Sequence, residues 1–459
     1  MSAISGRESH QEQTQTDASL ALVAGRSGSA LTFAGDGVVT RAQFLAHVRG
    51  VAATLPDCRH AINLCEGRYH FLVALCAAAA RGQVSLLPSS RARGAIDAVR
   101  HLCASSYGLR DAQSVVTGHA QDQTLPDLLP ERSGPAPRVQ RHALAVIGFT
   151  SGSTGPPTAN AKTWASFRIS TIQNLTALRD LWPANALARI VATVPPQHMY
   201  GMELSVLLPL FGPAAVHAGR PFFPHDIAAA LAHAPAHRLL VTTPVHLRAL
   251  VESGVTLPRL AGIVSATAPL SMALAAEAEA RYGCEVRELF GSTETCIIAR
   301  RRAARETTWT PLPGVSVTPR PDGALVRAAH LPAPVRLADL VEVGADGRFE
   351  LCGRNADLLE IAGKRASLAD LTRKLQAIPG VLDGVVLQTD PDTRGLRRIA
   401  AAVVAPDLRH EQILAALRET IDPVFLPRPL VQVPKLPRND VGKLSREALL
   451  MLLCGELRS

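Results

Sequence analysis

The sequence lacks the features that mark membrane, secreted and metal-binding proteins. No apolar run reaches the roughly 18 residues that a membrane span needs, and residues 1–18 are polar, without the apolar centre of a signal peptide. The eight cysteines form no C-x-x-C pair, which argues against a zinc site and a disulfide framework. We expect a cytoplasmic protein with reduced cysteines and a disordered leader over residues 1–18.

Aromatic residues are also few, at 4%, and no basic run is interleaved with them, so no nucleic-acid surface is indicated. The net charge of +9 comes mainly from arginine. It fits an acidic partner or an anionic substrate such as a nucleotide, and a general bias toward Arg and Ala explains it equally well. With 47% hydrophobic residues in 459, the chain is globular and long enough for two or three domains.

Strand and helix patterns alternate from residue 20 to residue 290, which predicts an α/β fold with parallel strands and ligand groups on the loops at strand ends. Between about 307 and 353 the helical patterns stop and Pro, Gly and Val dominate, as in a small β subdomain. A strand and helix unit of about a hundred residues follows. We therefore predict an N-terminal domain over 19–353 and a C-terminal α+β domain over 354–459.

The most informative segment is Phe149-Thr-Ser-Gly-Ser-Thr-Gly-Pro-Pro157, which follows the apolar strand pattern 144–149. Glycines let the main chain approach an anion, and the hydroxyls of Thr150, Ser151, Ser153 and Thr154 add donors. The P-loop lysine of nucleoside triphosphatases is absent. The segment is a phosphate-binding loop or an ordinary Ser/Gly surface turn.

Four further segments place polar groups at predicted strand ends or loops, and each is weak evidence when it is taken alone. In chain order they are Phe290-Gly-Ser-Thr-Glu294, Asp339, Gly353-Arg-Asn-Ala-Asp357 with Gly363-Lys-Arg365, and Leu436-Pro-Arg-Asn-Asp-Val-Gly-Lys443. A carboxylate such as Glu294 suits Mg²⁺, which prefers oxygen ligands.

Together these motifs, in this order, resemble the adenylate-forming superfamily of acyl-CoA synthetases, peptide-synthetase adenylation domains and luciferases, over nearly the whole chain after residue 20. The resemblance implies a large N-terminal domain of two packed sheets with helices and a small β-barrel, and a small mobile C-terminal domain. It implies ATP and Mg²⁺, a carboxylic acid activated as acyl-AMP, and a thiol that displaces AMP. No side-chain nucleophile is then needed.

The same resemblance assigns roles to residues of this chain. The β- and γ-phosphates would be bound by the loop Thr150, Ser151, Gly152, Ser153, Thr154 and Gly155. Adenosine would be bound by Phe290, Gly291, Ser292, Asp339 and Arg354, with Phe290 stacked on adenine and the last two residues on the ribose. The catalytic residues would be Thr293 at the α-phosphate, Glu294 as the Mg²⁺ ligand, and Lys443 between the carboxylate and the α-phosphate.

Two positions depart from the family pattern. After Pro157 the family has Lys-Gly, whereas this chain has Thr158 and Ala159, and Lys162 is the nearest substitute for the missing charge. The hinge, usually Asp or Lys, is Ala356 here, with Asp357 next to it. A catalytically impaired relative that binds a nucleotide or an acid is therefore an alternative.

The segment Pro195-Pro-Gln-His-Met-Tyr-Gly201 matches the acid-pocket motif of the family and implies acid contacts from His198, Gly201 and Ala266. His198 is equally well explained as a structural loop residue. Segments 62–69, 81–88 and 162–164 are most similar to the AMP-ligases of aryl-polyene (xanthomonadin-type) pigment clusters. That likeness implies a hydroxybenzoate-type acid and an acyl carrier protein as acceptor, with coenzyme A as the alternative.

Restoring the missing loop lysine should strengthen ATP binding. We expect Thr158→Lys to lower the KM for ATP by up to about fivefold, as a partly exposed ion pair with a phosphate would. Initial rates against ATP concentration measure this effect, with Thr158→Met as the uncharged control. An ATP dependence that Thr158→Lys leaves unchanged would show that the missing lysine does not limit binding.

Overall fold

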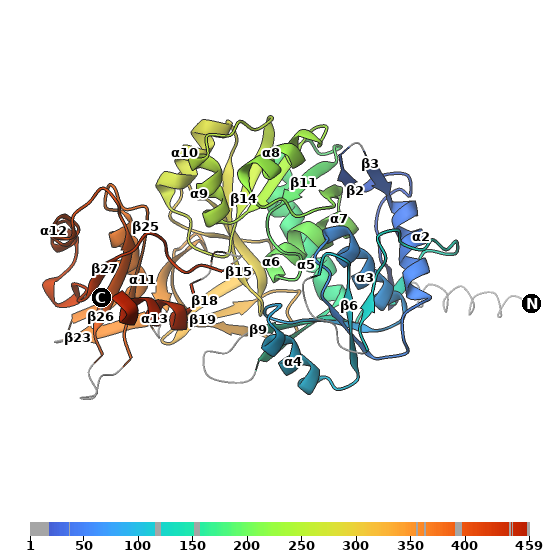
Figure 1. Ribbon diagram of the computed structural model, residues 1–459, viewed down its shortest axis with the longest axis horizontal. Coiled ribbons are helices and arrows are strands. Elements are labelled where there is room, and N and C mark those ends of the chain that lie inside the picture. The colour runs from blue at the N-terminus through green and yellow to red at the C-terminus, as the bar shows by residue number, and fades with distance from the viewer. Residues whose placement is uncertain are drawn as a thin grey trace, which may run out of the picture. The chain divides into compact units, whose positions relative to one another are not determined.

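The computed structural model describes residues 18–35, 37–114, 121–150, 157–354, 357–361, 364–390, 397–439, 442 and 444–456, which form two compact units (Figure 1). The first unit comprises residues up to Glu306 with Leu312–Val315 and Ala328–Pro332. The second comprises Thr307–Pro311, Ser316–Arg327 and the residues from Ala333. Most of the β-rich segment 307–353 thus groups with the C-terminal residues, and the domain boundary near 354 stays a prediction. Residues 1–17 of the predicted leader lie outside the described ranges.

Two mainly parallel sheets form the first unit. The smaller has the order β10-β9-β5-β4-β6-β7, and within it only the pair β9 and β10 is antiparallel among the described strands. Its strands are β4 (His60–Asn63), β5 (Val84–Leu87), β6 (Ser106–Arg110), β7 (Gln123–Thr124), β9 (Leu144–Thr150) and β10 (Thr158–Thr163).

The larger sheet runs β16-β15-β14-β13-β11-β12-β2-β3 within this unit, parallel from β15 to β2. Its strands are β2 (Ala30–Ala34), β3 (Gly37–Thr40), β11 (Ala188–Ala192), β12 (Ala214–His217), β13 (Arg238–Thr242), β14 (Leu260–Ser265), β15 (Val286–Ser292) and β16 (Cys296–Arg302). Separately, β1 (Ser19–Ala21) pairs with β8 (Arg138–Gln140).

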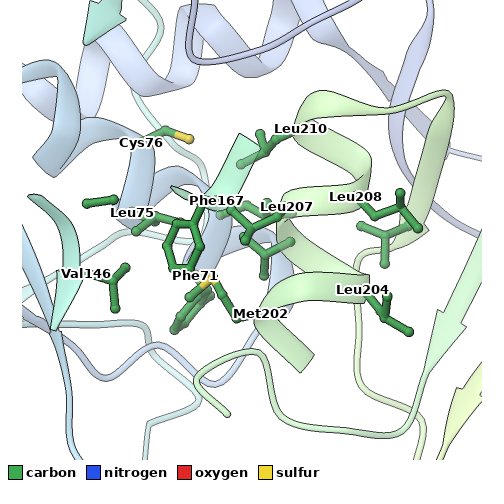
Figure 2. Close-up of a cluster of buried hydrophobic side chains, with 14 of the residues drawn as sticks. Phe71, Leu75, Cys76, Val146, Phe167, Met202, Leu204, Leu207, Leu208 and Leu210 are labelled. Atoms are coloured by element: carbon green, nitrogen blue, oxygen red, sulfur yellow. The ribbon is translucent and has the colours of Figure 1, made fainter. Parts of the chain in front are cut away.

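One helical layer packs against both sheets. Helix α3 (Arg68–Ala80) is apolar on all sides and almost entirely buried, as expected for a helix covered all round. Figure 2 shows Phe71 and Leu75 of α3 with Val146 of β9, Phe167 of α5 and the leucines that follow Met202. The layer contains α2 (Arg41–Ala52), α3, α5 (Trp164–Leu178), α6 (Met199–Met202), the π-helix η2 (Glu203–Leu207) and α7 (Leu208–Phe211).

Other helices cover the remaining faces. Helix α4 (Arg93–Leu102) packs Ile96 and Val99 on the other face of the smaller sheet. The other face of the larger sheet is covered by α8 (Pro224–Ala232), α9 (Pro244–Glu252) and α10 (Met272–Tyr282), which lie together in Figure 1. The predicted α/β fold of two packed sheets with parallel strands is confirmed. Within the described ranges, no helix combines the length and the apolarity that crossing a membrane requires.

The second unit contains four small sheets. They are β18 (Ser316–Arg320), β19 (Gly323–Arg327) and β20 (Val335–Leu337); β21 (Asp339–Val343) and β22 (Phe349–Arg354); β23 (Leu358–Ile361) and β24 (Lys364–Ser367); and β25 (Asp383–Gln388), β26 (Ile399–Val404) and β27 (Leu430–Gln432). On the last sheet, α11 (Leu368–Gln376) and α12 (His410–Thr420) pack on one face and α13 (Arg446–Glu456) on the other.

Arg41, at the start of α2, is 2% exposed and ties the first strands to α7 and β12. Its guanidinium donates to the carbonyls of Ala24 (2.7 Å), Ala30 (2.5 Å) and Pro209 (3.0 Å). The same group also reaches Ser29 Oγ, at 3.0 Å. Burial lowers the pKa of Arg41, so these bonds hold a desolvated charge in place.

We expect Arg41→Lys to lower the free energy of unfolding by about 2–4 kcal/mol, because a lysine leaves several of these buried carbonyls without a donor. Urea denaturation measures the change. Arg49→Lys is the control, since Arg49 also donates to carbonyls but in an exposed position, and it should change stability by less than about 0.5 kcal/mol. Equal losses in the two variants would contradict the role given to Arg41.

Candidate active site

Three of the predicted motifs meet at the carboxyl ends of parallel strands. The phosphate-loop strand β9 ends at Thr150, and β15 ends at Ser292. A Cβ atom placed on Gly148 of β9 would lie 3.3 Å from Cγ2 of Thr293 and 3.8 Å from Cε of Met199. The loop strand, the Thr-Glu turn and the acid-pocket segment therefore converge at one place.

The phosphate loop itself lies largely outside the described residues. Thr150 and Thr158 are paired directly opposite each other at the ends of β9 and β10, and the chain between them includes residues 151–156. The roles predicted for Ser151, Gly152, Ser153, Thr154 and Gly155 fall in this undescribed stretch and stay predictions. Thr158, which stands where the family has lysine, is exposed.

The Thr293-Glu294 turn has a main-chain shape that depends on glycine. A Cβ atom on Gly291 would lie 2.2 Å from the carbonyl oxygen of Cys296, whose own φ is 59°. Thr295 is fully buried, and its Oγ1 accepts a hydrogen bond from the Ser292 amide at 3.1 Å. The half-buried Phe290 precedes this turn.

The Glu294 side chain is half-buried, and among the described residues no side chain forms a salt bridge or hydrogen bond with its carboxylate. A single available carboxylate fits Mg²⁺, which is usually bound through one or two carboxylates, water and substrate phosphates. Within the same described part of the chain, no group of three or more His, Cys, Asp and Glu side chains could hold a metal on its own. Glu294 is therefore compatible with a metal that arrives with a nucleotide.

Lys162 does not lie on the exposed end of the loop hairpin. Its side chain is 5% exposed, and its Nζ donates to the main-chain carbonyl of Glu294 at 2.6 Å. Lys162 is opposite Val146 in the β9–β10 pair, four positions from Thr158. The ammonium thus contacts the Thr293-Glu294 turn, hereafter called the acidic turn. Lys162 and Glu294 are 132 residues apart, and the sequence did not indicate this contact.

Glu203, at the start of η2, is a second buried charge near this turn. One carboxylate oxygen accepts hydrogen bonds from Ser170 Oγ and from Asn174 Nδ2 at 2.9 Å, and the other accepts from the Ile297 amide at 2.9 Å. Burial raises the pKa of Glu203, while these donors and the charge of Lys162 oppose the rise. The sequence signal was available, because one carboxylate inside an apolar helical run needs buried partners.

His330 supports the same turn from the segment Ala328–Pro332. The residue is 3% exposed, and its Nε2 donates to the carbonyl of Thr295 at 2.7 Å. Because that oxygen can only accept, Nε2 carries the proton in the neutral ring. Burial, and then the charge of Lys162, lowers the pKa of His330.

The predicted acid-binding residues lie at the ends of neighbouring parts of the larger sheet. His198 is the half-buried N-cap of α6, after β11, and Ala266 is buried just after β14. Tyr200 joins them, since its hydroxyl donates to the Val264 carbonyl at 2.9 Å. Gly201 admits no side chain, because a Cβ atom there would lie 2.0 Å from the Pro195 carbonyl oxygen.

Two arginines brace this acid-pocket segment. Arg91 donates to Gln197 Oε1 at 3.4 Å and forms a salt bridge with Glu66 at 3.2 Å. Arg68 is fully buried and donates to the Val194 carbonyl at 3.0 Å and to Ser205 Oγ. Burial lowers the pKa of Arg68 to about 9. The sequence of segment 62–69 indicated only a resemblance to aryl-polyene ligases, and it did not predict the hydrogen bonds of Arg68.

In the second unit, the two predicted ribose-binding residues occupy paired positions. Asp339 opens β21 and lies directly opposite Arg354, which closes β22. The register of β21 and β22 places these two residues side by side, even though they are 15 positions apart in the sequence. For the predicted hinge, Ala356 lies outside the described residues, and the half-buried Asp357 follows it. The hinge role stays a prediction.

Lys443 also lies outside the described residues, but the chain beside it is anchored. Arg438 forms a two-point salt bridge with Asp383, with Nε and Nη2 each 2.8 Å from a carboxylate oxygen. Its Nη1 donates to the Gly442 carbonyl at 2.7 Å. Arg438 therefore joins the start of β25 to Gly442, the described residue next to Lys443 in the sequence.

Comparison with known proteins finds a matching family model and several similar proteins. The model of the family described as AMP-binding enzyme matches residues 38–326. A 4-coumarate–CoA ligase from Halorhodospira halophila is 30% identical over 66% of this chain and 76% of its own length. Enterobactin synthase component F from Shigella flexneri is 26% identical over 70% of this chain, which spans 30% of that protein.

Among solved structures, o-succinylbenzoate CoA synthetase from Bacillus subtilis, in complex with its acyl-adenylate intermediate, has a TM-score of 0.76. The match covers 90% of this chain and 93% of that chain, at 18% identity. A likeness at this identity shows a shared fold across both units of the chain.

The buried His330 should make the protein sensitive to acid. Because its folded-state pKa is lowered, the unfolded chain binds a proton where the folded chain does not, so stability is full above about pH 6.5 and falls as the pH drops below it. We expect His330→Gln to lose less stability than the wild type between about pH 7.5 and 5.5, measured by urea denaturation.

The control is His142→Gln, because His142 is exposed and its replacement should leave the pH dependence of stability unchanged. His60 and His217, whose pKa values are also lowered by burial, are present in both variants and cancel in the comparison. An acid loss in His330→Gln as large as in the wild type would contradict the assignment.

Proposed function

The chain belongs to the AMP-binding enzyme family, and we propose that it activates an aryl acid of hydroxybenzoate type and transfers it to the phosphopantetheine thiol of an acyl carrier protein. Its general class is that of an AMP-forming acid–thiol ligase, which uses ATP with Mg²⁺. The observation that carries the proposal is the close approach of Gly148, Thr293 and Met199, which supports one shared site for the three motifs that contain or adjoin these residues.

The reaction has two steps. An oxygen of the substrate carboxylate attacks the α-phosphorus of ATP, the bond to the β-phosphate breaks, and pyrophosphate leaves with the electron pair. The thiol, as thiolate, then attacks the carbonyl carbon of the acyl-AMP, and AMP leaves as a thioester forms. The chain has to position three substrates and stabilise charge, which matches a site built from loops at strand ends.

Within this proposal, residues from several of the motifs bind the nucleotide. The loop 150–155 binds the β- and γ-phosphates, Phe290 stacks on adenine beside Gly291 and Ser292, and Asp339 and Arg354 bind the ribose. The direct opposition of Asp339 and Arg354 supports a shared role, because directly opposite residues on adjacent strands lie close together on the same face of the sheet.

Three residues stabilise the negative charge at the reacting phosphate. Thr293 donates to the α-phosphate, and Glu294 holds Mg²⁺, which neutralises phosphate oxygens when it is bound. Lys443 lies between the acid carboxylate and the α-phosphate, where a flexible point charge stabilises the negative charge that develops between two anions.

Two observations support an aryl acid. The relative from Halorhodospira halophila is a 4-coumarate ligase, and its acid is aromatic. Two of the segments that resemble aryl-polyene ligases also contribute hydrogen bonds near the site. Arg68 donates to the carbonyl of Val194, and Lys162 donates to the carbonyl of Glu294. We propose that the acid lies against His198, Gly201 and Ala266.

The proposed acceptor is an acyl carrier protein, with coenzyme A as the alternative. A net charge of +9 suits an acidic carrier protein, and coenzyme A is an anion as well. The relatives include both a CoA ligase and a component of enterobactin synthase. We place the carrier protein first because of the aryl-polyene likeness, with coenzyme A as the alternative.

The test is ATP–pyrophosphate exchange with benzoate, 3- and 4-hydroxybenzoate, 4-coumarate and acetate. We expect the aryl acids to support exchange and acetate not to support it. No exchange with any acid would favour the third alternative, an impaired relative that only binds a nucleotide or an acid. Thioester formation with a holo carrier protein and with coenzyme A, compared at equal concentration, then identifies the acceptor.

Lys443→Ala separates the two steps. We expect acyl-AMP formation to slow by about 10²–10³-fold, because a charge that stabilises the transition state is lost, while thiol attack on preformed acyl-AMP changes far less. Single-turnover rates of each step measure the difference. Lys435→Ala, which removes an exposed lysine from the same segment, is the control. Equal slowing of both steps would contradict the role of Lys443.

A further inference from the structure

Lys162 is an unusual residue to find buried. A desolvated ammonium is costly unless a charge or strong acceptors surround it, and no described carboxylate lies within salt-bridge distance of it. Its ammonium donates to a main-chain carbonyl, that of Glu294, at 2.6 Å, and its charge also opposes the rise in the pKa of the buried Glu203. An apolar residue would fill the same position in β10 without that cost, so the ammonium itself has a task.

We propose that Lys162 is a positioning residue that orients Glu294 toward the Mg²⁺ of the bound nucleotide. The inference rests on the proposed function, which makes Glu294 the metal ligand. The carbonyl that Lys162 holds belongs to the peptide that links Glu294 to Thr295, so the bond fixes the main chain from which the Glu294 side chain projects.

Two more contacts fix the same short stretch. His330 donates to the Thr295 carbonyl at 2.7 Å, and the Ile297 amide donates to Glu203 at 2.9 Å. The main chain is therefore held from β10, from Ala328–Pro332 and from η2. The carboxylate of Glu294, in contrast, has no partner among the described residues. A fixed main chain with an available carboxylate is the arrangement expected of a ligand group prepared for a cation.

Strand β10 also joins this turn to the end of β9. Thr158 and Lys162 lie on the same strand, an even number of positions apart, and Thr158 pairs with Thr150, the last residue of β9. A shift of β10 would therefore displace both Thr158 and the donor to the Glu294 carbonyl. The lysine that is missing from position 158 is thus replaced by one that acts through the protein main chain and not on the triphosphate directly.

The experiment uses Mn²⁺ as the probe, on the full chain loaded with ATP. Electron paramagnetic resonance gives the affinity of the ATP complex for Mn²⁺, and calorimetry in EDTA gives the affinity for ATP without metal. The variants are Lys162→Met, which removes the donor, Lys162→Arg, which keeps a charged donor, and Glu294→Gln. Tyr107→Phe is the matched control, because it removes one buried hydrogen bond, to Gln83, away from the turn.

We expect Lys162→Met to weaken Mn²⁺ binding by about tenfold, the lower range for the loss of an outer-shell contact, and to leave metal-free ATP binding unchanged. Lys162→Arg should restore part of the affinity, and Tyr107→Phe should retain all of it. Equal loss of metal-free and Mn²⁺-dependent ATP binding in Lys162→Met would overturn the proposal, because it would mean that Lys162 contacts the triphosphate directly.

The proposal and the function can fail separately. If Glu294→Gln leaves Mn²⁺ affinity intact, the metal role assigned under the proposed function is wrong and the inference falls with it. If Glu294→Gln weakens Mn²⁺ binding and Lys162→Met does not, the inference alone is wrong. Should Lys162→Met not fold, His330→Leu removes the neighbouring donor to Thr295 and should cause a smaller loss of Mn²⁺ affinity, whereas unchanged affinity would count against the proposal.

Discussion

The buried helical layer that both sheets share is the constraint on which the site depends. Parallel strands bring their carboxyl ends to one edge of their own sheet, but β9 and β15 belong to different sheets. Helices α3 and α5 and the segment from α6 to α7 pack on both sheets and so fix one relative to the other. The contact between Gly148 and Thr293 follows from that packing, and with it the meeting of a phosphate loop and an acidic turn.

Buried charges in the first unit share one pattern, in which each binds main-chain groups at or near the ends of helices and strands. Arg41 binds a carbonyl of α7 and the carbonyl that follows α7, and Arg68 binds the last carbonyl of β11. Lys162 binds the carbonyl of Glu294, and Glu203 binds the amide of Ile297 near the start of β16. Loops have few ladder hydrogen bonds of their own, so a buried donor or acceptor gives them one defined shape. For Arg41, Arg68 and Glu203, several hydrogen bonds together offset the desolvation cost of the charge.

Sequence patterns predicted the elements that local chemistry determines. The alternation predicted from residue 20 to residue 290 corresponds to the strands and helices of the two large sheets, and the β-rich segment predicted from about 307 contains the strands β18 to β22. The order of motifs also located the site. The patterns could not predict the bond from Lys162 to Glu294 or that from His330 to Thr295, because both join segments that only tertiary packing brings together. The π-helix at Glu203–Leu207 was missed because it lies in an apolar run with no period of its own.

The position of α3 has a consequence for synthesis on the ribosome. The helix and the strands β4, β5 and β6 leave the ribosome before residue 111, yet Arg68 needs Val194 and Ser205 to bind its guanidinium. Until the segment up to α7 has emerged, the apolar side of α3 that faces the leucines of Figure 2 has no cover. The nascent chain therefore carries an exposed hydrophobic helix for roughly 130 residues of elongation, about 7–26 s at 5–20 residues per second, a period in which chaperones have a target.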